Sequence, residues 1–247
     1  MSGPTKNKAL GQHFLREPRI ARRILEAANL EPHHRVLEIG PGGGVLTEAL
    51  CEEVAEVVAV EADDRFADLL EGRFPNLTLV RGDALQVDLE ALGPFDRIVS
   101  NLPYQISGPV TARFLDLHAA QGWGHAVLMY QKEFANRLLA GPGSKQYGRL
   151  SVYTARYCQV AKVRDVPPGC FEPPPKVHST VITLTPHEEP PFEVRNEAAW
   201  RRIVDGAFSQ RRKQLKNTVH GVELGELATL RPEQVTPAQF AELANGA

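Results

Sequence analysis

The chain has little cysteine, and the few cysteines that it has are poorly placed for a site. Of 247 residues only Cys51, Cys158 and Cys170 are cysteines, an odd number with wide spacing, and no Cys-x-x-Cys pair occurs. The sequence therefore predicts neither a disulfide framework nor a zinc site. Free thiols are the usual state in a reducing compartment, so the composition favours a cytoplasmic protein.

Long hydrophobic runs are also absent. No apolar stretch approaches the ~18 residues of a membrane-spanning helix. The first residues, MSGPTKNKALGQHFL, contain no apolar core of signal-peptide length, so export is not expected. With 43% hydrophobic and 23% charged residues, the composition is that of a globular protein with one sizeable core and a small second module.

Charge is unevenly distributed along the chain. The formal net charge of −2 alone argues against a nucleic-acid partner, but residues 36–96 carry fourteen acidic and only three basic side chains. Residues 1–35 and 97–185 have an excess of basic side chains, so the folded chain can still present a basic face, although solvated helix faces are the alternative. The candidate RNA-binding residues are Arg19, Arg22, Arg23, Arg201, Arg202, Arg211, Arg212, Lys213 and Lys216.

Apolar strand-like runs alternate with helix-like segments, without internal repeats. This alternation predicts an α/β fold of parallel strands with helices on both faces. Strands are expected at 35–40, 56–63, 77–85, 95–101 and 125–131, and helices at 17–30, 45–53, 66–70, 108–118 and 132–140. Residues 150–166 fit no single element, and 176–186 predicts a last strand, in a hairpin at the sheet edge.

A Pro- and acid-rich linker at about 186–193 divides the predicted domains. Residues 1–186 form the α/β domain, and residues 187–247 form a small helical domain. Within the second, helices are expected at 196–221 and 236–246, the latter with Pro237 in its first turn.

A glycine-rich turn follows the first predicted strand. Gly40, Gly42 and Gly44 leave the turn bare of side chains, so a ligand can lie against backbone N–H groups at a helix N-terminus. The dinucleotide-binding pattern would place glycine where Val45 stands. A tight connection that binds no ligand remains the alternative for this turn.

Two acidic residues point to a nucleoside. Glu61 ends the second strand, 21 residues after Gly40, where a carboxylate can accept hydrogen bonds from both ribose hydroxyls. Asp83 ends the third strand, where it can accept from an adenine amine. Ligands bind at the carboxyl ends of parallel strands, so these residues describe one site, with NAD still possible.

The segment NLPY after the fourth strand favours adenine methylation over NAD. Adenine N6 is a poor nucleophile, and two acceptors aimed at its hydrogens would favour a more nucleophilic, tetrahedral nitrogen. The Asn101 side-chain oxygen and the Leu102 carbonyl can supply both, because Pro103 fixes the backbone after them. Tyr104 offers a stacking face for a flipped-out base, worth ~1–3 kcal/mol by analogy with single-strand binders.

These motifs resemble the rRNA adenine N6,N6-dimethyltransferases, most closely their small-subunit branch. The resemblance rests on LGQHFL (10–15), EIGPGGG (38–44), VEAD (60–63), GDAL (82–85), NLPYQIS (101–107), YGRLSV (147–152) and FEPPPKVHST (171–180). It implies a class I S-adenosylmethionine-dependent methyltransferase, Rossmann-like with a seven-stranded mostly parallel sheet, and a small C-terminal helical domain. It also implies dimethylation of two adjacent adenosines near the 3′ end of small-subunit (16S-type) rRNA during ribosome biogenesis.

Carried over by position, the resemblance implies roles for individual residues. The implied cofactor-binding residues are Gln12, His13, Leu15, Gly40, Gly42, Glu61, Asp83, Ala84 and Asn101. The first three would close over the methionine end of the cofactor, and Asp83 with Ala84 would face its adenine. The implied catalytic residues are Asn101, Leu102, Pro103, Tyr104 and Phe171, with the Phe171 ring opposite Tyr104. His13 departs from the asparagine common in the family and is given no catalytic role.

Two other functions stay open on the motifs. One is a large-subunit rRNA adenine N6-methyltransferase of the macrolide-resistance type, and the other is a ribosome assembly factor with dispensable catalysis. The expected partner is small-subunit rRNA in a pre-ribosomal particle, bound by a monomer. No membrane partner is expected. No metal is expected either, because the sulfonium of the cofactor already activates the methyl group.

Overall fold

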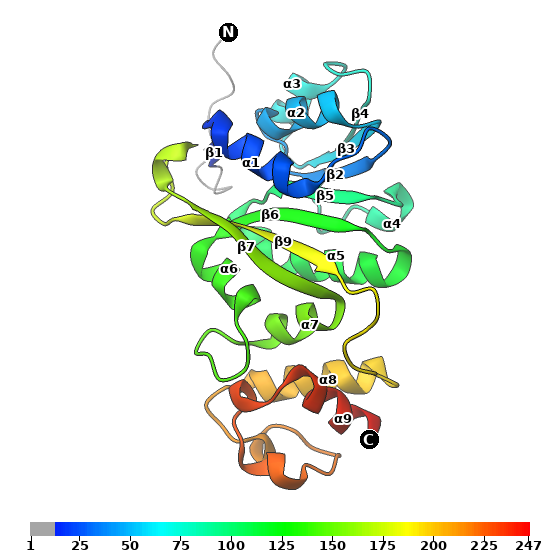
Figure 1. The fold of residues 1–247 in the computed structure, drawn as a ribbon, viewed down its shortest axis with the longest axis vertical. Coiled ribbons are helices and arrows are strands. Elements are labelled where there is room, and N and C mark those ends of the chain that lie inside the picture. The colour runs from blue at the N-terminus through cyan, green and yellow to red at the C-terminus, as the bar shows by residue number, and fades with distance from the viewer. Residues whose placement is uncertain (1–12) are drawn as a thin grey trace. The chain divides into compact units, whose positions relative to one another are not determined.

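The computed structural model describes residues 13–247, which form two compact units (Figure 1). Of the described residues, the first comprises 13–135 and 161–186, and the second comprises Asn136–Val160 and His187–Ala247. One division falls after Pro186, at the start of the predicted linker. The second unit also takes residues 136–160, predicted for the first domain, because Tyr147 and Val152 pack in the helical core with Trp200.

The first unit is built on a mostly parallel seven-stranded sheet. From one edge to the other, its strands are β4 (Leu77–Arg81), β3 (Glu56–Glu61), β2 (Arg35–Ile39), β5 (Arg97–Asn101), β6 (His125–Gln131), β9 (Ser179–Pro186) and β7 (Cys158–Val166). Strands β2 to β6 are parallel and β9 is antiparallel to β6. The apolar runs of β2, β3, β5 and β6 are buried, as strands covered on both faces require, whereas the edge strands β4 and β7 are partly exposed. The predicted last strand lies inside the sheet, and β7 is the edge.

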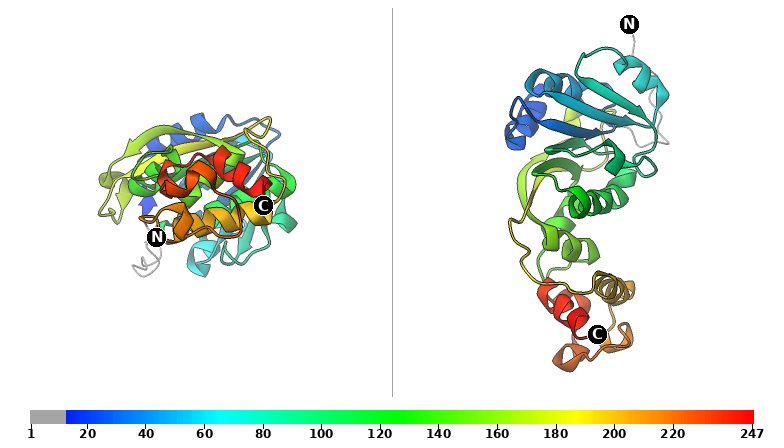
Figure 2. Two further views of the ribbon diagram at one scale, coloured as in Figure 1. Left: turned by 90° about the horizontal axis from the view of Figure 1, so that it is seen from below. Right: turned by 90° about the vertical axis from the view of Figure 1, so that its right-hand side faces the viewer.

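Helices cover both faces of this sheet, as predicted. Helix α1 (Pro18–Ala28), with Pro18 in its first turn, packs with α2 (Val45–Glu53) in a core that includes Val127 and Met129 of β6. The intervening residue Leu128 and the following Tyr130 point to the other face, where Tyr130 bonds Thr111 of α5 (Ser107–Gln121) at 2.7 Å. Figures 1 and 2 show α1 and α5 on opposite sides of the strands. Two shorter helices are α3 (Asp64–Leu70) and α4 (Leu89–Leu92).

A small two-stranded sheet ties the start of the described chain to the segment before β9. Strand β1 (Phe14–Leu15) pairs antiparallel with β8 (Phe171–Glu172), so that Leu15 lies opposite Phe171. Arg16 continues the pairing, because its amide donates to the Cys170 carbonyl at 2.9 Å and its side chain forms an ion pair with Glu172. The two segments, far apart in sequence, therefore form one ribbon.

The second unit has its own helical core. It contains α7 (Arg149–Tyr157), α8 (Glu197–Ser209) and α9 (Pro237–Asn245), with Trp200 and Phe240 fully buried. Helix α6 (Lys132–Leu139) begins in the first unit and ends in the second. The single helix predicted over 196–221 is wrong: α8 ends at Ser209, and the chain turns so that Leu215 and Val219 reach the core. The short 3₁₀ helices are η2 (Tyr104–Ile106), η3 (Pro168–Cys170), η4 (Leu215–Asn217), η5 (Gly225–Thr229) and η6 (Pro232–Gln234).

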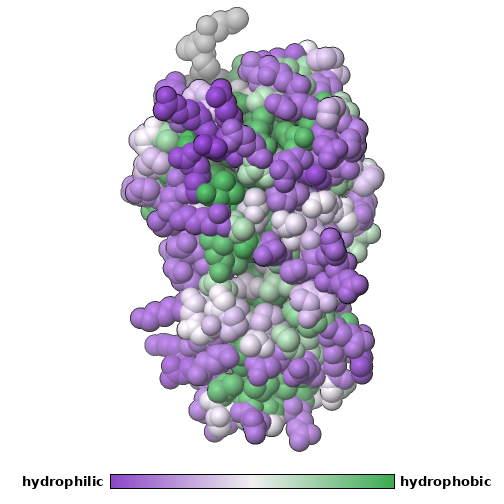
Figure 3. Space-filling view, in the orientation of Figure 1, coloured by the Kyte–Doolittle hydropathy of each residue, from purple (hydrophilic) through white to green (hydrophobic). Residues whose placement is uncertain are grey.

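The face of each unit seen in Figure 3 is mostly hydrophilic. In the view of Figure 3, polar side chains surround smaller apolar patches on both units. The large hydrophobic side chains that are exposed within residues 13–247 are Val45, Leu69 and Val177. Over the same residues, no helix combines the length and the apolar content that crossing a bilayer would require.

Candidate active site

A cavity of about 290 Å³ lies at the carboxyl ends of the central strands. This is the place where an open parallel sheet binds its ligands. The cavity is lined by residues from the segments 13–15, 38–43, 45–46, 60–63, 82–84 and 101–106. The structure therefore brings together all the predicted cofactor-binding residues that it describes. Gln12 lies outside the described residues.

The glycine turn between β2 and α2 forms one wall of the cavity. Gly42 has φ of +54°, and a Cβ built on it would lie 2.6 Å from the ring of Phe14. Gly40 has φ of +67°, and its Cβ would lie 3.1 Å from Pro103. Glycine is needed at both positions because L side chains strain at such φ values and because two rings approach the backbone closely. Phe14 thus lines the cavity, although no role was predicted for it.

Glu61 is held at the end of β3 by backbone donors. Its two oxygens accept from the amides of Gly42 at 3.0 Å and of Asp63 at 2.9 Å. Burial raises the pKa of the Glu61 carboxyl, and the backbone hydrogen bonds oppose this rise. A carboxylate oxygen can accept more than one hydrogen bond, so both can still bind ligand hydroxyls. This arrangement suits the ribose of a nucleoside.

Glu38 is a second buried acid in the cavity, and no role was predicted for it. It lies on β2 before the glycine turn, and its Oε2 accepts from the Thr47 hydroxyl at 2.8 Å. The pKa of Glu38 is raised to about 8, mainly by burial; the Thr47 hydrogen bond opposes the rise, and the charge of Glu61 adds to it. An acidic residue inside a buried apolar strand was the available signal in the sequence.

The turn after β4 supplies the predicted adenine-facing residues. Asp83 is exposed and its Oδ1 accepts from the Leu85 amide at 2.8 Å, which fixes the side chain in the turn. The Ala84 carbonyl accepts from Arg113 of α5 at 2.6 Å, and the same guanidinium bonds the Val87 carbonyl at 2.7 Å. Arg113 of α5 therefore holds the backbone of this turn in place.

The predicted NLPY segment lies at the end of β5, beside the cavity. Ser100 is fully buried and donates to the Ile39 carbonyl at 2.6 Å, which ties β5 to the strand before the glycine turn. Asn101 donates from Nδ2 to the His13 carbonyl at 3.3 Å. This contact uses a donor of the amide and leaves its Oδ1 as an acceptor. Pro103 has φ of −57° and leads into the 3₁₀ turn that begins at Tyr104.

Tyr104 is fixed at two points of its ring. Its hydroxyl bonds the Ser179 hydroxyl at 2.6 Å, and its ring centroid lies 5.5 Å from that of His13. Burial raises the pKa of Tyr104, opposed by the Ser179 contact. The His13 ring also contacts the Pro173 carbonyl through Nδ1 at 2.7 Å. His13 thus connects the NLPY segment with the loop after β8.

The structure does not bring Phe171 to the cavity. Its side chain is 3% exposed and packs in the apolar core with Leu15 and Ile20. The reason is the β1–β8 pairing, which places Phe171 opposite Leu15. Of the two aromatic faces predicted for the target base, only Tyr104 lines the cavity.

The predicted RNA-binding residues differ in their environments. On α1, Arg19, Arg22 and Arg23 are exposed, and Arg23 pairs with Glu26 at 2.7 Å. In the second unit, the exposed ones are Arg202, Arg212, Lys213 and Lys216. Two others have partners within the unit: Arg201 bonds Glu197 of the same helix at 3.0 Å, and Arg211 donates to the Ser144 carbonyl at 3.1 Å.

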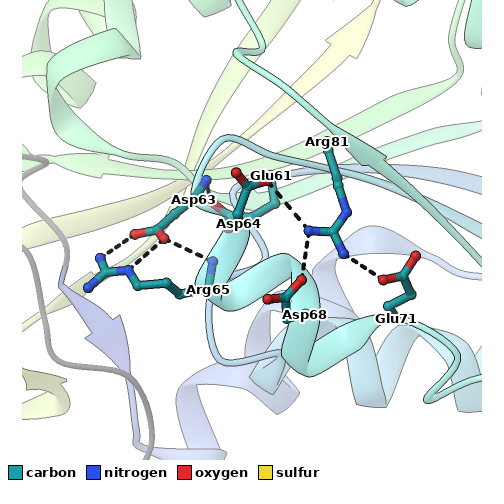
Figure 4. Close-up of polar contacts among 7 residues, drawn as sticks. All are labelled: Glu61, Asp63, Asp64, Arg65, Asp68, Glu71 and Arg81. Carbon is teal, nitrogen blue, oxygen red and sulfur yellow. Dashed lines mark hydrogen bonds and ion pairs between the residues drawn. The ribbon is translucent and has the colours of Figure 1, made fainter.

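The acidic segment 36–96 neutralises its own cations. Arg65 pairs with Asp63, which also lines the cavity, at 2.6 Å, and Arg73 pairs with Glu48 at 2.9 Å. Figure 4 shows Arg65 beside Asp63, and Arg81 between the carboxylates of Asp64, Asp68 and Glu71. The basic side chains of this segment are therefore engaged with acids, and the segment has no cationic surface for RNA.

Within residues 13–247, one group of side chains has the spacing of metal ligands. Glu31, His33 and His34 lie in the turn between α1 and β2. Burial lowers the pKa of His34, and its Nδ1 accepts from the Glu31 amide at 2.9 Å. A neutral ring whose Nδ1 accepts carries its proton on Nε2, so His34 has no lone pair for a metal.

Comparisons with known proteins agree on one family. The sequence model described as ribosomal RNA adenine dimethylase matches residues 3–242. The ribosomal RNA small subunit methyltransferase A of Geobacter sulfurreducens is 44% identical over 90% of this chain and 83% of its own. The protein of that name from Magnetococcus marinus is 43% identical over 98% of this chain and 92% of its own.

Solved structures give the same fold. A dimethyladenosine transferase from Plasmodium falciparum superposes with a TM-score of 0.79 at 29% identity, covering 94% of this chain and 96% of its own. The 23S rRNA methyltransferase ErmE superposes with a TM-score of 0.68 at 27% identity, covering 94% and 99%. The predicted fold class is confirmed.

Proposed function

The chain belongs to the ribosomal RNA adenine dimethylase family, whose members take methyl groups from S-adenosylmethionine, and we propose that it dimethylates N6 of two adjacent adenosines near the 3′ end of small-subunit rRNA. The observation that carries the proposal is Asn101. Its Oδ1 is left as an acceptor at the edge of a cavity whose far wall has nucleoside-type acceptors.

The cavity residues fit the cofactor. Glu61 would hold the ribose hydroxyls, the backbone around Gly40 and Gly42 would lie against the ligand, and Asp83 with Ala84 would face its adenine. The bare glycine backbone and the bonded Glu61 carboxylate support this assignment. The cofactor supplies a methyl group that its sulfonium already activates, so no metal is required.

The residues of NLPY would then prepare the target base. Tyr104 would stack on the flipped-out adenine, while Asn101 Oδ1 and the Leu102 carbonyl would accept from its N6 hydrogens. These acceptors hold the amine in line with the methyl group and favour a tetrahedral nitrogen. The N6 proton can leave after transfer, so catalysis is mostly positioning. The same geometry serves both methylations of one base.

Sequence similarity favours the small subunit over the large subunit. Relatives named small subunit methyltransferase A reach 44% identity, whereas the 23S rRNA methyltransferase ErmE reaches 27%. We propose a pre-ribosomal small subunit as the partner, bound by a cytoplasmic monomer. The exposed cations on α1 and in the second unit would contact its phosphates.

Asn101→Ala tests the proposed chemistry. The variant should lose methyl transfer to undermethylated small subunits while its affinity for S-adenosylmethionine, measured by calorimetry, is kept. Because Asn101 also donates to the His13 carbonyl, a melting curve checks that the β1 segment stays folded. Transfer near the wild-type rate would rule out the role of Asn101.

A deletion strain tests the substrate. Mass spectrometry of both rRNAs should find the two adenosines unmethylated in the small subunit and the large subunit unchanged. Loss of a methyl group from large-subunit rRNA instead would identify the macrolide-resistance type of activity. Growth rescue by Asn101→Ala would show that the assembly role outweighs catalysis.

A further inference from the structure

We infer that Ser179 is a positioning residue for methyl transfer, which acts by holding the Tyr104 ring in the orientation that stacks on the target adenine. The inference rests on the proposed function, because it assumes that Tyr104 is the stacking face. It adds a residue 75 positions along the chain from Tyr104, outside the cavity lining and without an assigned role.

The contact is short, and its Ser179 side is shielded from water. The Tyr104 hydroxyl and Ser179 Oγ are 2.6 Å apart, and Ser179 has no exposed surface. Water cannot replace a partner at a fully buried hydroxyl, so loss of the Tyr104 hydroxyl leaves Ser179 Oγ unsatisfied, and loss of Ser179 removes the contact that holds the end of the Tyr104 ring. The hydrogen bond therefore has a larger effect than one at the surface would have.

Ser179 is itself rigidly placed. It is the first residue of β9 and lies opposite Gln131 at the end of β6. The next pair of residues extends this register, because the Lys132 amide donates to the His178 carbonyl at 2.9 Å. The hydroxyl thus projects from a central strand pair, and its position is set by the sheet.

Tyr104 would be less constrained without this contact. It begins a three-residue 3₁₀ helix after Pro103, which fixes its backbone but not its side-chain torsions. The His13 ring touches one part of the tyrosine ring at a centroid distance of 5.5 Å with planes tilted by 32°. The Ser179 bond fixes the far end, and the two contacts together define the plane of the ring.

This arrangement explains why the position needs a hydroxyl. Phenylalanine would offer the same stacking surface, but it could not bond Ser179. Tyr104→Phe and Ser179→Ala should therefore have the same defect. Each should lower kcat on undermethylated small subunits about tenfold, as expected for one buried hydrogen bond. The KM for the subunit and the affinity for S-adenosylmethionine should not change.

The double variant and a neighbouring residue make the test specific. Tyr104→Phe with Ser179→Ala should be no slower than either single variant, because both remove one contact. Thr180→Val is the matched control, since it removes a fully buried hydroxyl of the same strand that bonds Asp165 at 2.7 Å instead. This control should keep the wild-type kcat.

Three results would overturn the inference. They are a wild-type kcat in Ser179→Ala, rate losses that multiply in the double variant, and a fall in melting temperature or cofactor affinity that accounts for the lost rate. Failure of the proposed function would look different, because the wild-type protein itself would then transfer no methyl group to small-subunit rRNA.

Discussion

At the scale of single residues, the cavity places two carboxyl groups in different surroundings. Glu61 accepts two backbone N–H bonds, whereas Glu38 accepts one hydroxyl and is 2% exposed. Backbone donors favour the charged form of an acid, and burial disfavours it. Burial without backbone donors therefore raises the pKa of Glu38 to about 8.

The raised pKa of Glu38 predicts a pH dependence of stability. The folded state keeps a proton on Glu38 up to about pH 8, whereas the unfolded chain loses it near its ordinary pKa of 4.5. The free energy of unfolding should therefore fall as the pH rises between these two values. Glu38→Gln, which can still accept from Thr47, should remove this loss and unfold at a higher temperature than wild type at pH 8.

Denaturation of the ligand-free protein at pH 5 and pH 8 measures this effect. Glu56→Gln is a useful contrast on the neighbouring strand, because a hydrogen bond from Arg35 lowers the pKa of Glu56. A lowered pKa stabilises the fold above the unfolded value, so this substitution should destabilise the protein at neutral pH. An equal pH dependence of stability in wild type and Glu38→Gln would contradict the raised pKa of Glu38 in the folded protein.

Most of the site could be predicted from residues because its motifs are local. Glu61 and Asn101 end their strands and Asp83 follows one, and parallel strands bring such positions together. Ser179 could not be found in this way, since its role depends on a partner 75 residues away. The burial of Phe171 likewise depends on its pairing with β1, which no periodicity reveals.

At the scale of elements, the turn between β2 and α2 depends more on Gly42 than on the neighbouring Gly43. Gly42→Ala should destabilise the fold by about 2 kcal/mol, because its φ is +54° and the new Cβ would displace Phe14. Gly43→Ala is the matched control, since its Cβ would meet no protein atom within 4 Å. Chemical denaturation of the ligand-free proteins measures both.

The expected result is a clear loss of stability for Gly42→Ala and little change for Gly43→Ala. Equal stability of the two variants would mean that the positive φ at Gly42 is not required. A smaller near-ultraviolet signal from the Phe14–Phe66 ring pair, now 4.8 Å apart, should accompany the loss.

The helices and strands themselves could be predicted where the spacing of apolar residues and the positions of turn residues indicate the same boundaries. Strands β2 to β6 and helices α1, α2, α3, α5 and α6 lie within a few residues of their predicted positions, because apolar runs and turn residues separate them, whereas the short helix α4 was not predicted. Residues 150–166 were ambiguous because α7 passes into β7 at Tyr157–Cys158 without a turn. The two elements are distinguished only by their packing, because α7 packs in the core of the second unit and β7 packs in the core of the first.

At the scale of the whole molecule, the exposed cations predict salt-dependent RNA binding. Alanine at Arg212, Lys213 and Lys216 together should make the slope of log affinity against log salt shallower by about two to three. Filter binding to small-subunit rRNA at several salt concentrations measures the slope. Melting temperature should stay unchanged, because none of the three side chains is buried.

Two comparisons complete this test. Arg231→Ala, an exposed cation outside the predicted clusters, should leave the slope almost unchanged. Arg211→Ala should lower the melting temperature, because its guanidinium holds the Ser144 carbonyl. A slope that stays at the wild-type value in the triple variant would remove this cluster from the RNA interface.

The outermost strand of the sheet has a consequence for the behaviour of the protein in solution. β4 is at one edge of the seven-stranded sheet, and its last residue Arg81 is surrounded by Asp64, Asp68 and Glu71 (Figure 4). An open edge is where a strand from another molecule could add, and solvated charges oppose that addition. This charged cluster should therefore protect the protein against edge-to-edge aggregation, most strongly at low ionic strength, where screening is weak.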